Sequence, residues 1–115
     1  MSTMNQLTVN ITQALKVDDE FIPDVFALHQ NYPNPFNPVT NIVYDIPEPS
    51  EVRITIYNIT GQNVRTLAQG QHEPGRYRIQ WNATNDYGNP LSSGMYIYRI
   101  HAGDFVSVKK LILMK

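Results

Sequence analysis

The side chains that commonly do chemistry are scattered along this sequence. His29, His72 and His101 stand far apart, and none has a second histidine or a carboxylate at the spacing of a metal-binding motif. We expect them to be ordinary surface or turn residues. Ser92-Ser93-Gly94 lacks the flanking glycines of a nucleophile elbow and precedes a predicted strand, not a helix. The sequence therefore predicts no catalytic residues, no metal site and no cofactor.

Two segments are rich in oxygen ligands. Asp18-Asp19-Glu20 with Asp24 does not match the spacing of an EF-hand loop, so we expect a solvated acidic linker. Asn85 to Asn89 surrounds an aspartate, but Asn and Asp favour turns because their side chains bond to nearby backbone. We interpret the second segment as a loop.

Composition excludes several classes of protein. The 115 residues suffice for one domain, and a hydrophobic content of 42% argues against a disordered chain. A net charge of −1 gives no basic footprint for nucleic acid or for a membrane surface. No cysteine is present, which excludes disulfides and thiolate metal sites. No apolar run is long enough to insert into a membrane, and the start lacks a signal peptide, so an exported parent would carry its targeting peptide upstream.

Alternation of apolar and polar residues dominates the rest of the sequence. Leu7, Val9 and Ile11 predict a first strand, after which the pattern fades into the acidic stretch. We therefore divide the chain into residues 1–25, a linker or the remnant strand of a preceding domain, and residues 26–115, one domain. Further alternating segments lie at 40–46, 52–57, 64–67, 76–81, 95–100 and 105–113. Short strands at this spacing predict an antiparallel β-sandwich of about seven strands.

The aromatic residues follow the same periodicity. Tyr44, Tyr77, Trp81, Tyr96 and Tyr98 all lie on predicted strands, where we expect them to pack in the core rather than to bind sugars.

The final strand has a phase problem. Val106 and Val108 share one face by parity, whereas Leu111 and Leu113 share the other. A bulge near Lys109-Lys110 would bring all four residues to the core. The alternative is that one pair is exposed.

A proline-rich segment precedes the main run of strands. Pro33, Pro35 and Pro38 exclude a helix and a central strand, so we expect an extended coil with tight turns at Asn34 and Asn37. Phe36 is expected to close one end of the core while the prolines fix the coil.

These residues also carry a family resemblance. The run from Gln30 to Thr40 resembles the opening motif of the type A C-terminal sorting domain that type IX secretion systems of Bacteroidetes and related phyla read on exported proteins. Later blocks match in order: Ile56-Tyr57-Asn58, Gly75-Arg76-Tyr77 with Trp81, Ser93-Gly94-Met95-Tyr96, and Lys109-Lys110-Leu111 with Lys115. The central blocks are similar to the immunoglobulin-like domain of flagellar hook-capping proteins, which implies a shared sandwich. Asn58 and Asn82 stand where the family commonly has Asp.

The resemblance implies a function without catalysis. Such a module ends a parent cargo protein, is exported through the periplasm, and is recognised by the outer-membrane translocon for delivery to the cell surface or the medium. In some species a sortase-like surface protease then removes it. The residues that match the family motifs are Pro33, Asn34, Pro35, Phe36, Asn37, Pro38, Gly94, Tyr96, Lys109, Lys110 and Lys115. The lysines have two readings, as specificity contacts on an edge strand or as protection of that edge against aggregation.

Two other interpretations stay open. One is an accessory carbohydrate-binding sandwich of a secreted enzyme, which needs solvent-facing aromatic residues. The other is a structural spacer that self-associates, with an edge at Leu7 to Thr12 pairing to form a weak homodimer.

Overall fold

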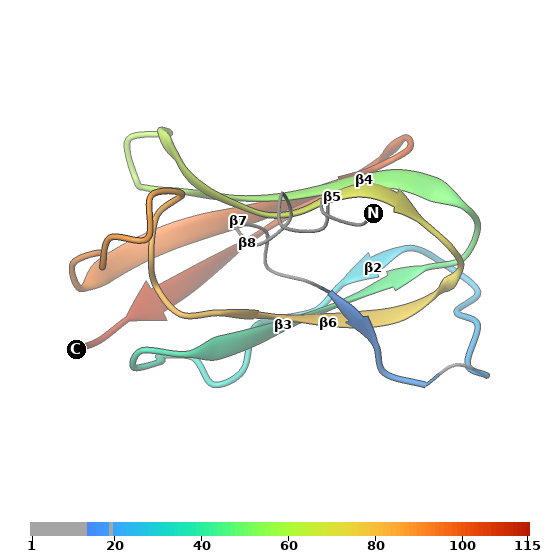
Figure 1. Ribbon diagram of the computed structural model, residues 1–115, viewed down its shortest axis with the longest axis horizontal. Helices are drawn as coiled ribbons and strands as arrows, with labels where there is room; N and C mark the ends of the chain where they lie inside the picture. Colours follow the sequence, from blue (N-terminus) through green and yellow to red (C-terminus); the bar gives the residue numbers. More distant parts are fainter. Residues whose placement is uncertain (1–13, 19) are drawn as a thin grey trace, which may run out of the picture.

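The chain folds as two antiparallel sheets packed face to face (Figure 1). This computed structural model describes residues 14–18 and 20–115. The strands are β1 (Leu15–Lys16), β2 (Ala27–Leu28), β3 (Thr40–Ile46), β4 (Ser50–Tyr57), β5 (Asn63–His72), β6 (Gly75–Trp81), β7 (Gly94–Ala102) and β8 (Phe105–Leu113). One sheet has the order β1-β6-β3-β2 and the other β5-β4-β7-β8. This architecture confirms the predicted antiparallel β-sandwich.

The core lies between the sheets and follows the predicted alternation. Inward-facing side chains of β3, β4 and β6 are almost fully buried, and they belong to one cluster that also receives β7 and β8. The five aromatic residues assigned to the core are all buried: Tyr44, Tyr77, Trp81, Tyr96 and Tyr98. Burial of such large rings supplies much of the core of a small domain.

The two inner strands of the second sheet are β4 and β7. Register shifts occur between β4 and β5, at Ile54/Thr55 and at Ile56/Tyr57. No shift interrupts the pairing of β7 with β8. The bulge considered near Lys109-Lys110 is therefore absent, and the alternative holds: Val106 and Val108 are exposed to 52% and 53%, whereas Leu111 and Leu113 are buried.

The N-terminal segment touches the sandwich before the predicted domain boundary. Leu15 and Lys16 pair with Arg78 and Tyr77 of β6. The strand predicted at Leu7 to Ile11, and with it the edge considered for a homodimer, lies outside the described residues. The division at residue 25 stays a prediction.

Among residues 14–18 and 20–115, none forms a helix with the length and apolar character that crossing a bilayer requires.

Candidate functional site: the proline segment and the terminal strand

The outer edge of β8 is bonded to the proline segment, which we define as residues 30–38. The amide of Phe36 donates to the carbonyl of Ile112 at 2.9 Å, and the amide of Met114 donates to the carbonyl of Phe36 at 2.9 Å. Phe36 thereby forms an isolated parallel bridge with Leu113. The Ile112 amide donates to Oδ1 of Asn34 at 2.9 Å. Residues near opposite ends of the sequence therefore share one edge of the sandwich.

The side chain of Phe36 fixes this contact to the core. It is only 2% exposed, and its ring centroid lies 5.7 Å from that of Trp81. Trp81 in turn meets Tyr96 edge to face at 5.8 Å. Aromatic pairs at such separations add to the stabilisation that burial alone provides. The expectation that Phe36 closes one end of the core is confirmed.

A buried polar network holds the start of the proline segment. The amide of Asn31 donates to the Tyr98 hydroxyl at 2.8 Å, and that hydroxyl donates to the carbonyl of His29 at 2.8 Å. The side chain of Asn31 donates to Oγ1 of Thr40 at 2.9 Å. Burial raises the pKa of Tyr98 to about 12, so its hydroxyl stays protonated at neutral pH and keeps both bonds.

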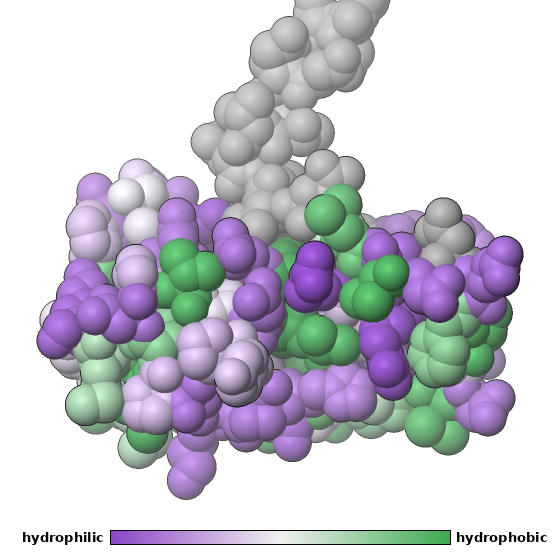
Figure 2. Space-filling view, turned by 90° about the horizontal axis from the view of Figure 1, so that it is seen from below, coloured by the Kyte–Doolittle hydropathy of each residue, from purple (hydrophilic) through white to green (hydrophobic). Residues whose placement is uncertain are grey.

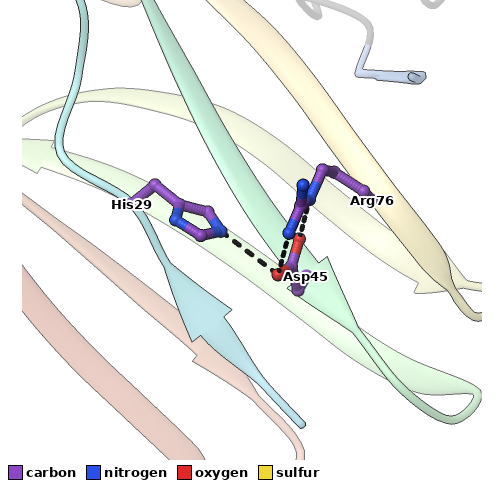
Figure 3. Close-up of polar contacts among 3 residues, drawn as sticks. All are labelled: His29, Asp45 and Arg76. Atoms are coloured by element: carbon purple, nitrogen blue, oxygen red, sulfur yellow. Dashed lines mark hydrogen bonds and ion pairs between the residues drawn. The ribbon is translucent and has the colours of Figure 1, made fainter. Parts of the chain in front are cut away.

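An ion-pair cluster lies beside this network (Figure 3). Asp45 of β3 accepts two hydrogen bonds from Arg76 of β6, at 2.7 and 3.0 Å, and its Oδ2 lies 3.1 Å from Nε2 of His29. Burial alone would raise the pKa of the Asp45 carboxyl, but the bonds from Arg76 and His29 outweigh it and hold the pKa below its usual value. The cluster therefore ties residue 29, just before the proline segment, to both inner strands of its sheet.

The outer face of that sheet carries a shallow pocket next to the cluster. Its volume is about 400 Å³, and its lining includes His29, Gln30, Tyr32, Asn41 and Arg78. Figure 2 views the molecule from this side and shows apolar surface framed by hydrophilic side chains. Because three lining residues belong to or adjoin the proline segment, a ligand in the pocket would contact that segment directly.

The predicted motif residues gather at this end of the molecule. Pro33, Asn34, Pro35, Asn37 and Pro38 are exposed in the segment itself. Gly94 pairs with Leu113 and Tyr96 with Leu111 at the start of β7. The backbone amide of Lys115 donates to Oγ of Ser93 at 2.9 Å.

The two lysines on β8 face opposite ways. Lys109 is half-buried on the inner side, whereas Lys110 is exposed on the outer side. The carbonyl of Lys110 accepts a bond from Nε2 of Gln30 at 2.8 Å. The motif residues thus gather at one edge of the sandwich, where Phe36 and Tyr96 are buried and the others are exposed or half-buried.

The last strand lies at the edge of its sheet, but that edge is only partly open. Backbone groups of Lys110, Ile112 and Met114 are engaged by the proline segment. Successive residues of an antiparallel strand direct their backbone groups alternately to the two sides. Val106 and Val108 therefore face the same edge, and within the described residues no partner occupies their amides and carbonyls.

Two polar residues, Asn31 and His72, make more contacts in the fold than their sequence context predicts. Asn31 was part of the matched motif, yet its central position in the network follows from contacts with residues far along the chain. His72 was expected to be an ordinary turn residue. Instead its Nε2 lies 2.8 Å from the Tyr44 hydroxyl, and its ring lies 4.6 Å from that of Tyr77. In the described part of the chain, no group of three or more His, Cys, Asp or Glu side chains could hold a metal ion.

The fold and this edge define an immunoglobulin-like β-sandwich domain. Residues 37–104, more than half of the chain, match the FlgD Ig-like domain. The chain belongs to that family. The match covers the central blocks on which the resemblance to hook-capping domains rested, but it ends one residue before β8 begins. The candidate site therefore lies mostly outside the region that defines the family.

Two solved structures share the fold. One is the dimeric latent form of PorU from Porphyromonas gingivalis, with a TM-score of 0.64 and 24% identity over 85% of this chain and 10% of that one. The other is PorZ, an essential bacterial surface component of the type IX secretion system of the same organism, with a TM-score of 0.52 and 20% identity over 80% of this chain and 12% of that one. The chain thus spans about a tenth of either protein. No curated protein matches the sequence.

Proposed function

We propose that this chain is a non-catalytic sorting module that directs a parent protein through a type IX secretion system to the cell surface or the medium. The observation that carries the proposal is the hydrogen-bonded contact between the proline segment and β8. The opening and closing motifs of the sorting-domain resemblance are far apart in the sequence, but they lie side by side at one edge of the sandwich. The fold shared with PorU and PorZ supports the same reading.

The partners follow from this role. The outer-membrane translocon would read the surface, and a sortase-like protease would act on the module in species that remove it. A folded module suits recognition because its groups are already ordered, so less conformational entropy is lost on binding than for a short disordered tag. In this proposal the module performs no reaction and serves the cargo domain that precedes it.

The carbohydrate-binding alternative would have to rest on exposed aromatic residues such as Tyr32 and Tyr87. Five strand aromatics that could have formed a sugar-stacking surface are in the core.

A secretion assay tests the proposal. A reporter with a Sec signal and this chain at its C-terminus should reach the surface or medium of a type IX-competent host. Truncation after Val108 is a poor test, because it removes Leu111 and Leu113 from the core and so confounds folding with recognition.

A pair of charge variants separates an effect on recognition from an effect on folding. The variant Lys110→Glu/Lys115→Glu changes two exposed cations of the candidate site, and Lys16→Glu/Arg53→Glu changes two exposed cations outside it. We expect the first variant to leave the reporter in the periplasm and the second to be secreted. Equal secretion of both variants, or periplasmic retention of the unmodified chain, would contradict the proposal.

A further inference from the structure

The open part of the β8 edge lacks most of the features that usually protect an exposed edge strand from pairing. Exposed edges are normally blunted by charged residues, proline or a covering loop, because their free backbone groups invite pairing with other chains. Here the proline segment bonds to the edge only from Lys110 onward, and Phe26 stacks on Phe105 where the strand begins. Val106 and Val108, whose outward-facing backbone groups have no partner among residues 14–18 and 20–115, present β-branched apolar side chains to solvent instead.

On the neighbouring strand β7, the residues opposite Val106 and Val108 are His101 and Arg99, and apolar residues follow toward the other end of the pair. Met95 of β7 is opposite Ile112, and Ile97 of β7 is opposite Lys110. Met95 and Ile112 are exposed to 43% and 38%. An added strand would therefore extend a face on which apolar and polar residues are mixed, and it would supply partners for outward amides and carbonyls that have none among the described residues.

The charged side chains of β7 and β8 are all basic. Neither β7 nor β8 contains Asp or Glu, whereas both contain cations. Arg99 is engaged, since it donates to the Tyr57 hydroxyl at 2.7 Å. Lys109 and Lys110 have no ion pair with any residue that the structure describes, and they stand on opposite faces at one end of the open stretch.

We propose that β8 from Val106 to Lys110 receives a β-strand of a partner protein, with apolar residues opposite Val106 and Val108 and carboxylates opposite Lys109 and Lys110. This inference rests on the proposed sorting function, and it specifies the residues of the strand that would bind the module. A second copy of this chain fits less well, because its β8 would bring further lysines to the seam and no carboxylate.

The test is a titration of the purified chain, labelled with nitrogen-15, with short synthetic peptides monitored by amide chemical shifts. The probes contain the cores Glu-Glu-Val-Thr-Val and Val-Thr-Val-Glu-Glu, which suit antiparallel and parallel pairing. In the control peptides lysine replaces glutamate. We expect saturable shifts at the amides of residues 106 to 110 with at least one glutamate peptide at up to about 5 mM, where millimolar affinities are measurable, and none with the lysine peptides.

Two variants at one position separate backbone from side-chain effects. Val108→Pro removes a backbone amide that points outward from the edge strand, and proline is tolerated at such positions. This variant should weaken peptide binding about tenfold or more. Val108→Thr keeps the amide and should bind nearly as the unmodified chain does. If the proline variant loses its dispersed spectrum, Val108→Glu serves in its place, since the added charge should repel the glutamate peptides alone.

Several results would overturn the inference. They are an absence of shifts at 106 to 110, equal shifts with the lysine peptides, and unchanged binding by both Val108→Pro and Val108→Glu. A dimer seen by light scattering and lost in Val108→Pro would assign the edge to a second copy instead. Because these measurements need no secretion, their failure is distinct from failure of the sorting assay, in which the same variants can then be compared.

Discussion

Asp45 is a buried acid whose carboxylate is bonded by residues of two different segments. Arg76 and His29 both bond to it, and only 7% of its side chain is exposed. Removing one member of such a group leaves the others without a counter-charge, which costs more than the pair contributes on its own.

We predict that Asp45→Asn lowers the free energy of unfolding at neutral pH by about 1–3 kcal/mol, a range that allows for the partial exposure of Arg76. Because the pKa of Asp45 is lowered in the fold, its contribution is complete above the unfolded value near 3.9 and is lost as the pH falls through the folded value. Urea unfolding of both proteins at pH 7, 4 and 2.5 measures this. The difference should shrink at low pH, and a constant difference would show that the charge of Asp45 is not responsible.

His72 gives the stability of the fold a second pH dependence. As with Asp45, stability falls as the pH falls, but it does so in a higher pH range. Burial lowers the pKa of the His72 imidazole. This effect exceeds the opposing effect of the hydrogen bond between the imidazole and the Gly70 carbonyl. The unfolded chain therefore binds a proton more readily than the folded chain does. The stabilisation by neutral His72 is complete above about pH 6.5 and is lost progressively as the pH falls below it.

We predict that His72→Gln, which keeps a polar side chain near Tyr44, flattens the stability profile between pH 7.5 and 5.5 relative to the unmodified chain. Thermal unfolding at closely spaced pH values gives both curves. The other two histidines are common to both proteins, so their contributions cancel in the comparison. Parallel curves would mean that protonation of His72 does not couple to folding.

At the scale of elements, local patterns determined most of the strands. The alternation of Ile42, Tyr44 and Ile46, and of Val52, Ile54 and Ile56, places these residues in the core as predicted. The short strands β1 and β2 gave no such pattern, because two residues are too few to show a period.

The candidate site was predictable only in part, for a physical reason. Periodicity reports how one segment faces a core, and it carries no information on which distant segment covers an edge. The bonds from Gln30 to Lys110 and from Ile112 to Asn34 join residues 80 and 78 positions apart. The family resemblance identified both partners, but the contact between them is a property of the folded chain.

Asn34 provides a local test of that contact. Its Oδ1 is the acceptor for the Ile112 amide. We predict that Asn34→Ala lowers global stability by only about 0.5–1.5 kcal/mol and speeds hydrogen exchange of the Ile112 amide by a larger factor than that of the β4 amides. Asn34→Asp retains the acceptor and serves as the control. Exchange of the Ile112 amide at the same rate in all three proteins would show that the bond does not protect it.

At the scale of the whole molecule, the two sheets share one core. Side chains from both sheets belong to a single buried cluster, and Trp81, the sole tryptophan, lies within it. Small domains with one core unfold in an all-or-none transition.

We predict that denaturant unfolding curves from Trp81 fluorescence and from far-ultraviolet circular dichroism coincide. Phe36→Ala, which removes the ring packed on Trp81, should shift both curves together by about 3–5 kcal/mol. Val106→Ala, at an exposed position of β8, is the matched control and should have little effect. Separation of the two curves would indicate that this end of the molecule unfolds on its own.

The bridge between Phe36 and Leu113 has a consequence for how the protein is made. A ribosome delivers residue 36 long before residue 113, so the joint surface is absent while the chain is still being translated. It forms only when the late residues have been added and have folded back onto the early ones. Under the sorting proposal, a chain that is truncated or misfolded would not display the address, and export would be reserved for finished molecules.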